Sequence, residues 1–241
     1  MGKFGESMWA DEEFSNNYLE NADIYIVERR KMIKMISSFF VHYSHGDRIS
    51  LLDLGCGDGV LTESLFNVNN KIHATLVDGS QAMLQKAKER LGTRQNLSFV
   101  EANFQEILDN RVEFGQFDYC ISAHAIHHLE MKDKERLFRF INKHLVTGGK
   151  FINADVVLPP SREIEEWYFV IWKQWMQKMM NKLNLRDEKP EDVIKKFKDP
   201  LSTNSPDTLE AQLETLKNAG FSDVDCYYKN GIFALLGGIK K

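Results

Sequence analysis

A glycine loop and a distant aspartate are spaced to bind a ligand that contains a ribose. The segment Asp53-Leu54-Gly55-Cys56-Gly57-Asp58-Gly59 follows a short apolar run and precedes a helical pattern. Glycines at such a point permit a tight turn and a close approach of the backbone to a ligand. Asp78 ends a second apolar run, where a carboxylate accepts hydrogen bonds from ribose hydroxyls.

The loop differs from the dinucleotide-binding fingerprint. That fingerprint is G-x-G-x-x-G/A, whereas the glycines here alternate and position 60 is valine. Asp58 also stands where a pyrophosphate would lie, and two negative groups side by side repel each other. The loop therefore favours a ligand with a ribose and no phosphate. The alternative is a glycine turn that binds no ligand.

Histidines and carboxylates follow two later apolar runs. His124, His127 and His128 come after residues 117–122, while Asn153 and Asp155 end residues 150–157. No cysteine or dense set of carboxylates accompanies the histidines, so we expect no metal site. We interpret His127, His128 and Asp155 as candidate catalytic residues, because a histidine with an ordinary pKa near 6.5 can remove a proton. Asn153 is a candidate for orienting a substrate. Packing and capping roles remain open for all of them.

The elements that must position these residues alternate between strands and helices. We predict strands at residues 49–54, 73–78, 97–101, 117–122 and 150–157, and helices at 60–66, 81–91 and 132–145. Such alternation produces a parallel sheet with helices on both faces. Residues 224–229 and 232–236 flank Asn230-Gly231, which is a strong hairpin signal. The predicted fold class is α/β, a doubly wound, seven-stranded, mostly parallel sheet that ends in an antiparallel hairpin.

Two helical regions lie outside this core. Residues 12–44 predict one or two amphipathic helices, and residues 161–182 carry two apolar stripes. One stripe suffices to dock a helix, so the other is a candidate roof for an apolar substrate pocket, with Trp167, Tyr168 and Trp172 as lining residues. We predict a single domain over residues 1–241, with a helical lid (1–46), a Rossmann-like core (47–160), a helical insert (161–205) and a final helix and hairpin (206–241).

Composition narrows the class of protein. The chain has 241 residues, 31 basic and 35 acidic, with a formal net charge of −4, so charge gives no reason to expect a nucleic-acid or membrane partner. No stretch approaches the roughly 20 apolar residues of a membrane span, and the first residues lack the apolar stretch of a signal peptide. Three widely separated cysteines suit a reducing compartment. We expect a cytoplasmic protein whose oligomeric state, a homodimer included, stays open.

Five segments in order resemble the successive motifs of class I S-adenosylmethionine (SAM)-dependent methyltransferases. They are LLDLGCGDG, TLVDGS, FVEANF, FDYCISAHAIHHL and LVTGGKFINADVV. The resemblance covers about residues 49–157, and the terminal hairpin agrees with the last two strands of the family. It implies SAM as cofactor and a Rossmann-like fold.

The resemblance also implies roles for individual residues. Asp53, Gly55, Cys56 and Gly57 would line the methionine part of SAM, and Asp78 would hold the ribose. The other implied cofactor contacts are Gly79 and Met83 near the ribose and adenine, Asn103 and Phe104 at the adenine, Ala123 under the sulfonium, and Tyr25 and Arg30 in a helix that closes over SAM. A surface helix with solvated charges is the alternative for Tyr25, Arg29 and Arg30.

The whole layout is similar to a narrower branch, which includes the carboxy-SAM synthases of tRNA modification. Those synthases hold a carboxylate with an arginine from the helix before the final strands. The matching stretch here, residues 213–221, has Thr215 near that point and no arginine. This difference counts against carboxy-SAM synthesis.

The expected activity is methyl transfer from SAM to a small-molecule acceptor by in-line displacement. One alternative is non-methylating SAM chemistry, such as cyclisation or a carboxy-SAM-like reaction with SAM as main substrate. A second is methylation of RNA or protein, and a third is a SAM-binding module without activity. The sequence does not identify the acceptor.

Overall fold

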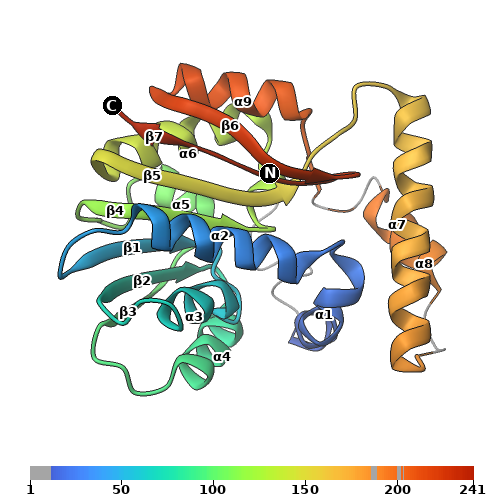
Figure 1. Ribbon diagram of the computed structural model, residues 1–241, viewed down its shortest axis with the longest axis horizontal. Coiled ribbons are helices and arrows are strands. Elements are labelled where there is room, and N and C mark those ends of the chain that lie inside the picture. The colour runs from blue at the N-terminus through green and yellow to red at the C-terminus, as the bar shows by residue number, and fades with distance from the viewer. Residues whose placement is uncertain (1–11, 186–188, 200–201, 203) are drawn as a thin grey trace.

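The computed structural model describes residues 12–185, 189–199, 202 and 204–241 (Figure 1). The first eleven residues of the predicted lid and three short parts of the predicted insert lie outside the described residues. None of the described helices is long and apolar enough to cross a membrane.

A seven-stranded sheet forms the centre of the fold, in the order β3-β2-β1-β4-β5-β7-β6. The strands are β1 (Ile49–Leu54), β2 (Ile72–Asp78), β3 (Leu97–Glu101), β4 (Phe117–Ala123), β5 (Leu145–Val156), β6 (Phe221–Asn230) and β7 (Phe233–Lys240). The first five are parallel, and β7 inserts antiparallel between β5 and β6. The predicted fold class is confirmed.

Helices cover both faces of the sheet and bury two apolar cores. One core lies against α1 (Glu12–Tyr25), α2 (Arg29–Tyr43), α3 (Val60–Phe66), α4 (Gln81–Leu91), α7 (Arg162–Leu183) and α8 (Pro190–Phe197). The other lies against α5 (Phe104–Leu108), α6 (Met131–His144) and α9 (Leu209–Asn218). Short apolar strands such as β1 are buried on both sides, as expected for parallel strands between two helical layers.

Several boundaries differ from the sequence prediction. β5 begins at Leu145 rather than at residue 150, because the glycine pair at 148–149 sits in an irregularity of the strand, where its register with β4 shifts. α9 begins at Leu209 rather than at residue 206, because the Thr208 hydroxyl caps it by accepting a hydrogen bond from the Ala211 N–H at 3.2 Å. Both hairpin strands are longer than predicted.

The order of the strands creates a place for a ligand. β1 pairs with β2 on one side and with β4 on the other, so the chain reverses its direction of winding there. Ligands of open α/β sheets bind at such a switch point, beyond the carboxyl ends of the strands. Figure 1 shows α1 and α7 beside the ends to which the strand arrows point.

The insert helix α7 docks by one stripe, which includes Trp172 of the predicted pocket lining. Its buried side chains are Phe169, Trp172, Met176 and Met180. The indole N–H of Trp172 donates to the main-chain oxygen of Tyr25 at 2.6 Å, which ties α7 to the lid. Trp167 belongs to the opposite face and is 60% exposed.

Candidate active site

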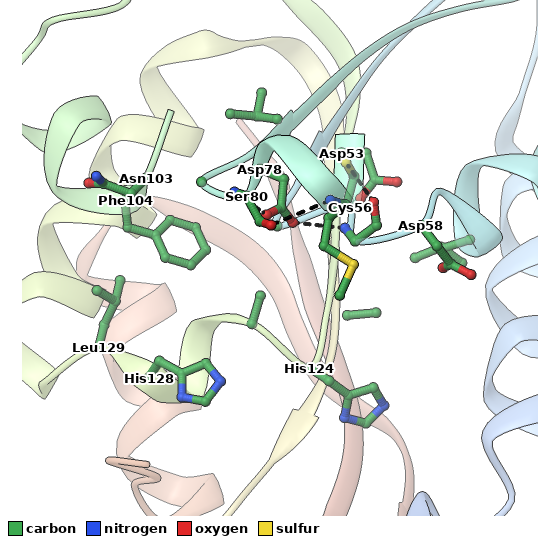
Figure 2. Close-up of a pocket in the computed structure, with 18 of the residues that line it drawn as sticks. Asp53, Cys56, Asp58, Asp78, Ser80, Asn103, Phe104, His124, His128 and Leu129 are labelled. Atoms are coloured by element: carbon green, nitrogen blue, oxygen red, sulfur yellow. Dashed lines mark hydrogen bonds between the residues drawn. The ribbon is translucent and has the colours of Figure 1, made fainter. Parts of the chain in front are cut away.

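A cavity of about 1300 Å³ lies at the carboxyl ends of the strands, under α1 and α2. The glycine loop after β1, the end of β2, the start of α5 and the turn after β4 all contribute to its lining. Figure 2 shows Asp78 and Cys56 on one side of this cavity and the rings of His124 and His128 on the other. Residues from segments far apart in the sequence therefore face one space.

Asp78 holds the glycine loop against β2. Its carboxylate accepts hydrogen bonds from the Gly57 N–H and the Ser80 N–H, both at 2.9 Å (Figure 2). Burial raises the pKa of Asp78 against the effect of these two bonds. The predicted ribose-binding residue thus lines the cavity and also shapes the loop.

Two glycines of the loop differ in what surrounds them. Gly55 has a φ of +66°, and a Cβ there would lie 2.4 Å from the Cβ of Ala125. Gly57 has a φ of +54°, but a Cβ there would meet nothing within 4 Å. Gly55 is therefore required by packing within the protein, while a Cβ at Gly57, which also lines the cavity, would enter open space.

Buried acidic and thiol groups stand beneath the loop. Burial raises the pKa of Asp53 to about 7, although its carboxylate accepts a hydrogen bond from the Thr62 hydroxyl at 2.6 Å. Burial also raises the pKa of the Cys56 thiol, so this thiol stays neutral and forms an uncharged wall. The carboxylate of Asp58 pairs with the Arg90 guanidinium. Because Arg90 offsets the charge of Asp58, that charge no longer argues against a pyrophosphate. The spacing of the glycines is the remaining difference from dinucleotide-binding loops.

The far end of the cavity carries the residues expected at an adenine. Met83, Gly79, Asn103 and Phe104 all line it. The Asn103 side-chain oxygen caps α5 by accepting a hydrogen bond from the Glu106 N–H at 3.0 Å. A carbonyl oxygen has two lone pairs, so Asn103 retains one site for a second donor.

The structure separates the three predicted catalytic residues. His128 lines the cavity, whereas His127 and Asp155 do not. The Nδ1 atom of His127, in the short helix η3 (Ile126–His128), lies 2.5 Å from Oδ1 of Asp155 in β5. His124 lines the cavity as well, with a φ of +53°, and burial lowers its pKa to about 3.

Asp155 is the centre of a buried polar cluster. The Asn153 side-chain amide donates to it at 3.2 Å, and the Val156 N–H donates at 2.9 Å. Burial acts to raise the pKa of Asp155, but the interactions with His127 outweigh it, and the pKa is lowered to about 2. Neither Asn153 nor Asp155 lines the cavity. Among the described residues, no three histidine, cysteine or acidic side chains are grouped to hold a metal ion.

The lid places Arg29, not Arg30, at the cavity. Arg29 and Tyr18 line it, and the Arg29 side chain is 17% exposed. The Arg30 side chain is 83% exposed, and Tyr25 does not line the cavity. The sequence analysis did not predict Tyr18 as a site residue. Its position seven residues before Tyr25, which puts both side chains on one face of a helix, could have indicated it.

The aromatic residues predicted for a substrate pocket lie elsewhere. Tyr168 accepts a hydrogen bond from the Lys229 ammonium at 2.9 Å, and Trp172 packs against Phe197 and Phe233. Trp167 is exposed, and neither it nor Tyr168 or Trp172 lines the cavity.

Asn204 and Ser205, which no sequence motif marks, do line the cavity. The Ser205 N–H donates to the main-chain oxygen of His127 at 2.8 Å. The buried Lys134 ammonium donates to the Ser205 carbonyl and pairs with Asp207. These contacts fix the end of the insert beside His127.

Comparisons with known proteins agree with this geometry. Residues 52–151 match the family model of a methyltransferase domain. The chain is 24% identical to the carboxy-S-adenosyl-L-methionine synthase of Staphylococcus epidermidis, over 93% of this chain and 92% of that protein. It is 31% identical to the malonyl-[acyl-carrier protein] O-methyltransferase of Bacillus anthracis, over 51% of this chain and 43% of that protein.

Solved structures show the same fold. An O-methyltransferase family protein from Burkholderia thailandensis has a TM-score of 0.68 at 12% identity, covering 98% of this chain and 63% of that one. Human N-acetylserotonin methyltransferase in complex with SAM has a TM-score of 0.54 at 15% identity, covering 96% of this chain and 59% of that one. This chain thus spans about three fifths of their length, and the likeness is one of fold.

The methyltransferase-domain match covers the strands that form the switch point. The first-named relative extends the similarity to the lid, the insert and the hairpin. Together these similarities support a class I SAM-dependent methyltransferase that is related to the carboxy-SAM synthases.

Proposed function

We propose that this enzyme transfers the methyl group of SAM to a small-molecule acceptor bound in the same cavity. The cavity volume of about 1300 Å³ carries the proposal. A pocket for one drug-sized ligand has roughly 300–1,000 Å³, so this cavity has room for SAM and a second small molecule.

The residues present fit SAM. The open space at Gly57 accommodates the methionine part beside Asp53, Gly55 and Cys56, and Asp78 accepts hydrogen bonds from the ribose hydroxyls. The remaining proposed contacts are Gly79, Met83, Asn103 and Phe104 around the adenosine, Ala123 beneath the sulfonium, and Arg29 in the lid. Arg29 replaces Arg30 and Tyr25 of the sequence prediction, because only Arg29 of these three lines the cavity.

When bound, SAM supplies a methyl group activated by the sulfonium. The protein aligns the acceptor with that group and excludes water. His128 faces the cavity and is the proposed proton acceptor when the nucleophile is a hydroxyl or amine. His124 is a weaker choice, because a base whose pKa is about 3 removes protons poorly at neutral pH. His127 and Asp155 support the turn that carries His128.

The relationship with the carboxy-SAM synthase favours a second candidate, in which SAM is the main substrate of a non-methylating reaction. That similarity spans nearly the whole chain. Against it, Thr215 lies outside the cavity lining, with its hydroxyl donating to the Ala211 carbonyl at 2.7 Å. This position therefore offers the cavity neither an arginine nor any other group.

Calorimetry with SAM and S-adenosylhomocysteine tests the cofactor, and mass spectrometry of SAM incubated with the protein alone tests the reaction. We expect both ligands to bind and SAM to stay intact until an acceptor is added. Consumption of SAM without an acceptor would support the second candidate. Absence of binding by either ligand would contradict both.

A further inference from the structure

The helix α7 carries an apolar patch on the face that points away from the sheet. Trp167 lies three residues after Ile164, and Val170 and Ile171 follow Trp167 by three and four residues, so the four share one face of the helix. Trp167 and Val170 are 60% and 50% exposed. Ile164 and Ile171 are partly exposed and belong to neither apolar core. We call these four residues the outer patch, and a contiguous patch of this kind indicates an interaction surface.

The helix α7 cannot turn to bury the outer patch against its own sheet. Its opposite side is already buried, through Phe169, Trp172, Met176 and Met180. The hydrogen bond from the Trp172 indole to the Tyr25 carbonyl fixes the rotation of the helix. Figure 1 shows α7 at the edge of the molecule, with no described helix or strand beyond it. The described part of the chain therefore leaves the outer patch uncovered.

Two charges of opposite sign flank the outer patch. Glu163 precedes it and Lys178 follows it on the same face, and both side chains are exposed. The neighbouring Arg162 and Glu166 pair with each other at 3.3 Å, whereas Glu163 and Lys178 have no ion-pair partner among the described residues. They lie about 22 Å apart along the helix axis, well beyond the screening length of roughly 8 Å at physiological salt. Within one molecule they therefore do not stabilise each other.

An antiparallel pair of α7 helices brings these two charges together. If the helices cross between Val170 and Ile171, Glu163 and Lys178 lie at equal distances on either side of the crossing point. Each Glu163 then faces Lys178 of the second copy, and each Val170 faces Ile171 of the second copy. A twofold axis repeats every contact, so two ion pairs flank an apolar centre. A parallel pair would instead place like charges opposite each other, and the antiparallel arrangement also opposes the two helix dipoles.

We propose that the outer patch is the centre of a dimer interface, in which two copies of this chain pack their α7 helices antiparallel, with Glu163 of each beside Lys178 of the other. The charge pattern favours a second copy over an unrelated partner, because the surface is complementary to itself. The inference does not depend on the proposed function, since no residue of the outer patch lines the cavity.

The interface is expected to be reversible. One helical face is smaller than the roughly 800 Å² per partner of a stable interface. Trp167 lies one turn from the crossing point, and a tryptophan near the centre of an interface contributes strongly to binding. We expect a dimer with a Kd of about 1–100 µM.

Sedimentation equilibrium of the full chain, from about 1 µM to about 500 µM, spans this Kd and tests the dimer. The first test variant is Val170→Glu, and its matched control is Val41→Glu. Val41 lies in α2 and is 54% exposed, so both changes put a charge on a half-exposed helical valine. The wild type should dimerise within this range. Val170→Glu should weaken the dimer by about 100-fold or more, because two unpaired carboxylates would enter its centre, whereas Val41→Glu should change the Kd by less than about 3-fold.

Charge reversal tests the antiparallel pairing. Glu163→Lys and Lys178→Glu should each weaken the dimer by about 5- to 30-fold, since each turns two attractive pairs into repulsive ones. The two changes alter the net charge in opposite directions, so a shared loss cannot come from net charge. The double variant Glu163→Lys with Lys178→Glu should return the Kd to within about 3-fold of the wild type.

Circular dichroism and thermal denaturation verify that each variant is folded. If Val170→Glu is unfolded, Val170→Ser takes its place and should weaken the dimer by about 5- to 30-fold. A wild type that stays monomeric at the highest concentration would overturn the inference and leave the outer patch to a different partner. A dimer that survives in a folded Val170→Glu protein, or is lost equally in Val41→Glu, would also overturn it, as would a double charge reversal that restores nothing.

Discussion

The Nδ1 atom of His127 lies 2.5 Å from Oδ1 of Asp155, and both side chains are buried behind the cavity. The second oxygen of Asp155 accepts a hydrogen bond from the main-chain N–H of His127 at 3.0 Å. One carboxylate thus fixes both the ring and the backbone of the turn. The His128 ring lies 4.1 Å from the His127 ring, centroid to centroid, so the orientation of His128 depends on this pair.

Asp155→Asn should destabilise the protein without weakening cofactor binding. Removing one member of a buried pair typically costs about 3–5 kcal/mol, and the lowering of the Asp155 pKa from 3.8 to about 2 corresponds to about 2 kcal/mol. We expect a loss of about 2–4 kcal/mol in the free energy of unfolding at pH 7, measured by urea denaturation. The affinity for S-adenosylhomocysteine should change by less than about 3-fold, because Asp155 lies outside the cavity.

The difference between wild type and Asp155→Asn should shrink in acid. Because the folded pKa of Asp155 lies below its ordinary value, the stabilisation is complete above about pH 4 and is lost as the pH falls toward 2. Urea denaturation at pH 7 and pH 3 measures this. Asp47→Asn, a change in an exposed ion pair, is the control and should leave stability nearly unchanged. An equal difference at both pH values would contradict the assignment.

Gly55→Ala should mainly reduce the stability of the protein, whereas Gly57→Ala should mainly reduce its binding of SAM. A Cβ at Gly55 would lie 2.4 Å from that of Ala125, so we expect Gly55→Ala to lose about 2–4 kcal/mol of stability. A Cβ at Gly57 meets no protein atom within 4 Å. Gly57→Ala should lose only about 1–2 kcal/mol, from its left-handed backbone conformation, yet it should abolish SAM binding by filling the space proposed for the ligand.

Thermal denaturation and calorimetry with SAM distinguish these two failures. For each variant, the loss of SAM affinity is compared with the loss of stability. The loss of affinity relative to the loss of stability should be far larger for Gly57→Ala than for Gly55→Ala. Normal SAM affinity in a folded Gly57→Ala protein would mean that the methionine part of SAM lies elsewhere in the cavity.

The sheet and the glycine loop were predictable because their signals are local. A short apolar run that ends in glycines needs no partner to be read as a buried strand with a turn, and the Ser80 cap of α4 follows from adjacent residues, with its hydroxyl accepting a hydrogen bond from the Met83 N–H. The hairpin at Asn230-Gly231 is local in the same way. These are the features that the structure reproduces.

The direction in which individual side chains point was not predictable, because it depends on contacts between distant segments. Arg29 and Arg30 are adjacent, and the bend of the backbone at Glu28 decides which of them lines the cavity. Glu28 has a φ of +50°, and its carboxylate accepts hydrogen bonds from Tyr228 and Asn230 of the hairpin. Likewise, the φ of +53° at His124 sets which histidines face the cavity. Neither conformation has a signal in the neighbouring residue types, since neither residue is glycine.

SAM affinity should fall as the pH drops below about 7. The pKa of Asp53 is about 7 in the ligand-free protein, and SAM carries a positive sulfonium and ammonium. A cation favours the ionised carboxylate, so binding lowers the pKa of Asp53 and releases a proton. Below pH 7, affinity should decline by up to about tenfold per pH unit until the pKa of the complex is reached. Asp78, whose pKa burial also raises, acts in the same direction.

Calorimetry of SAM binding between pH 5.5 and 8.5, repeated in buffers with different ionisation enthalpies, measures both the affinity and the released proton. Asp53→Asn is the test variant, and its affinity should vary less with pH than that of the wild type. Proton uptake on binding at pH 6.5 would contradict an ionised Asp53 in the complex.

Asp78→Ala should weaken SAM binding by about 100-fold or more, because it removes charge-assisted hydrogen bonds to the ribose as well as those to the Gly57 and Ser80 N–H groups. Ser80→Ala is the matched control. It removes the cap of α4, at a cost of about 1 kcal/mol in stability, and leaves the carboxylate in place. Unchanged SAM affinity in Asp78→Ala would remove the basis of the cofactor assignment.

Trp172 and Trp167 lie on the same helix and should respond oppositely to truncation. Trp172 is buried between Phe197 and Phe233, and its indole N–H donates to the Tyr25 carbonyl. Trp172→Ala should therefore cost about 3–5 kcal/mol and loosen the lid. Trp167 is 60% exposed, so Trp167→Ala should change stability by about 0.5 kcal/mol or less.

Hydrogen exchange of the α1 amides measures the loosening directly. Protection of α1 should fall in Trp172→Ala and stay unchanged in Trp167→Ala, because the bond from Trp172 to Tyr25 joins the insert to the end of α1. Trp172→Phe keeps most of the apolar contact and removes the donor, so it should lose α1 protection at a smaller cost in global stability. If Trp172→Phe leaves α1 protection unchanged, apolar packing alone holds the lid, and the hydrogen bond contributes nothing to its closure.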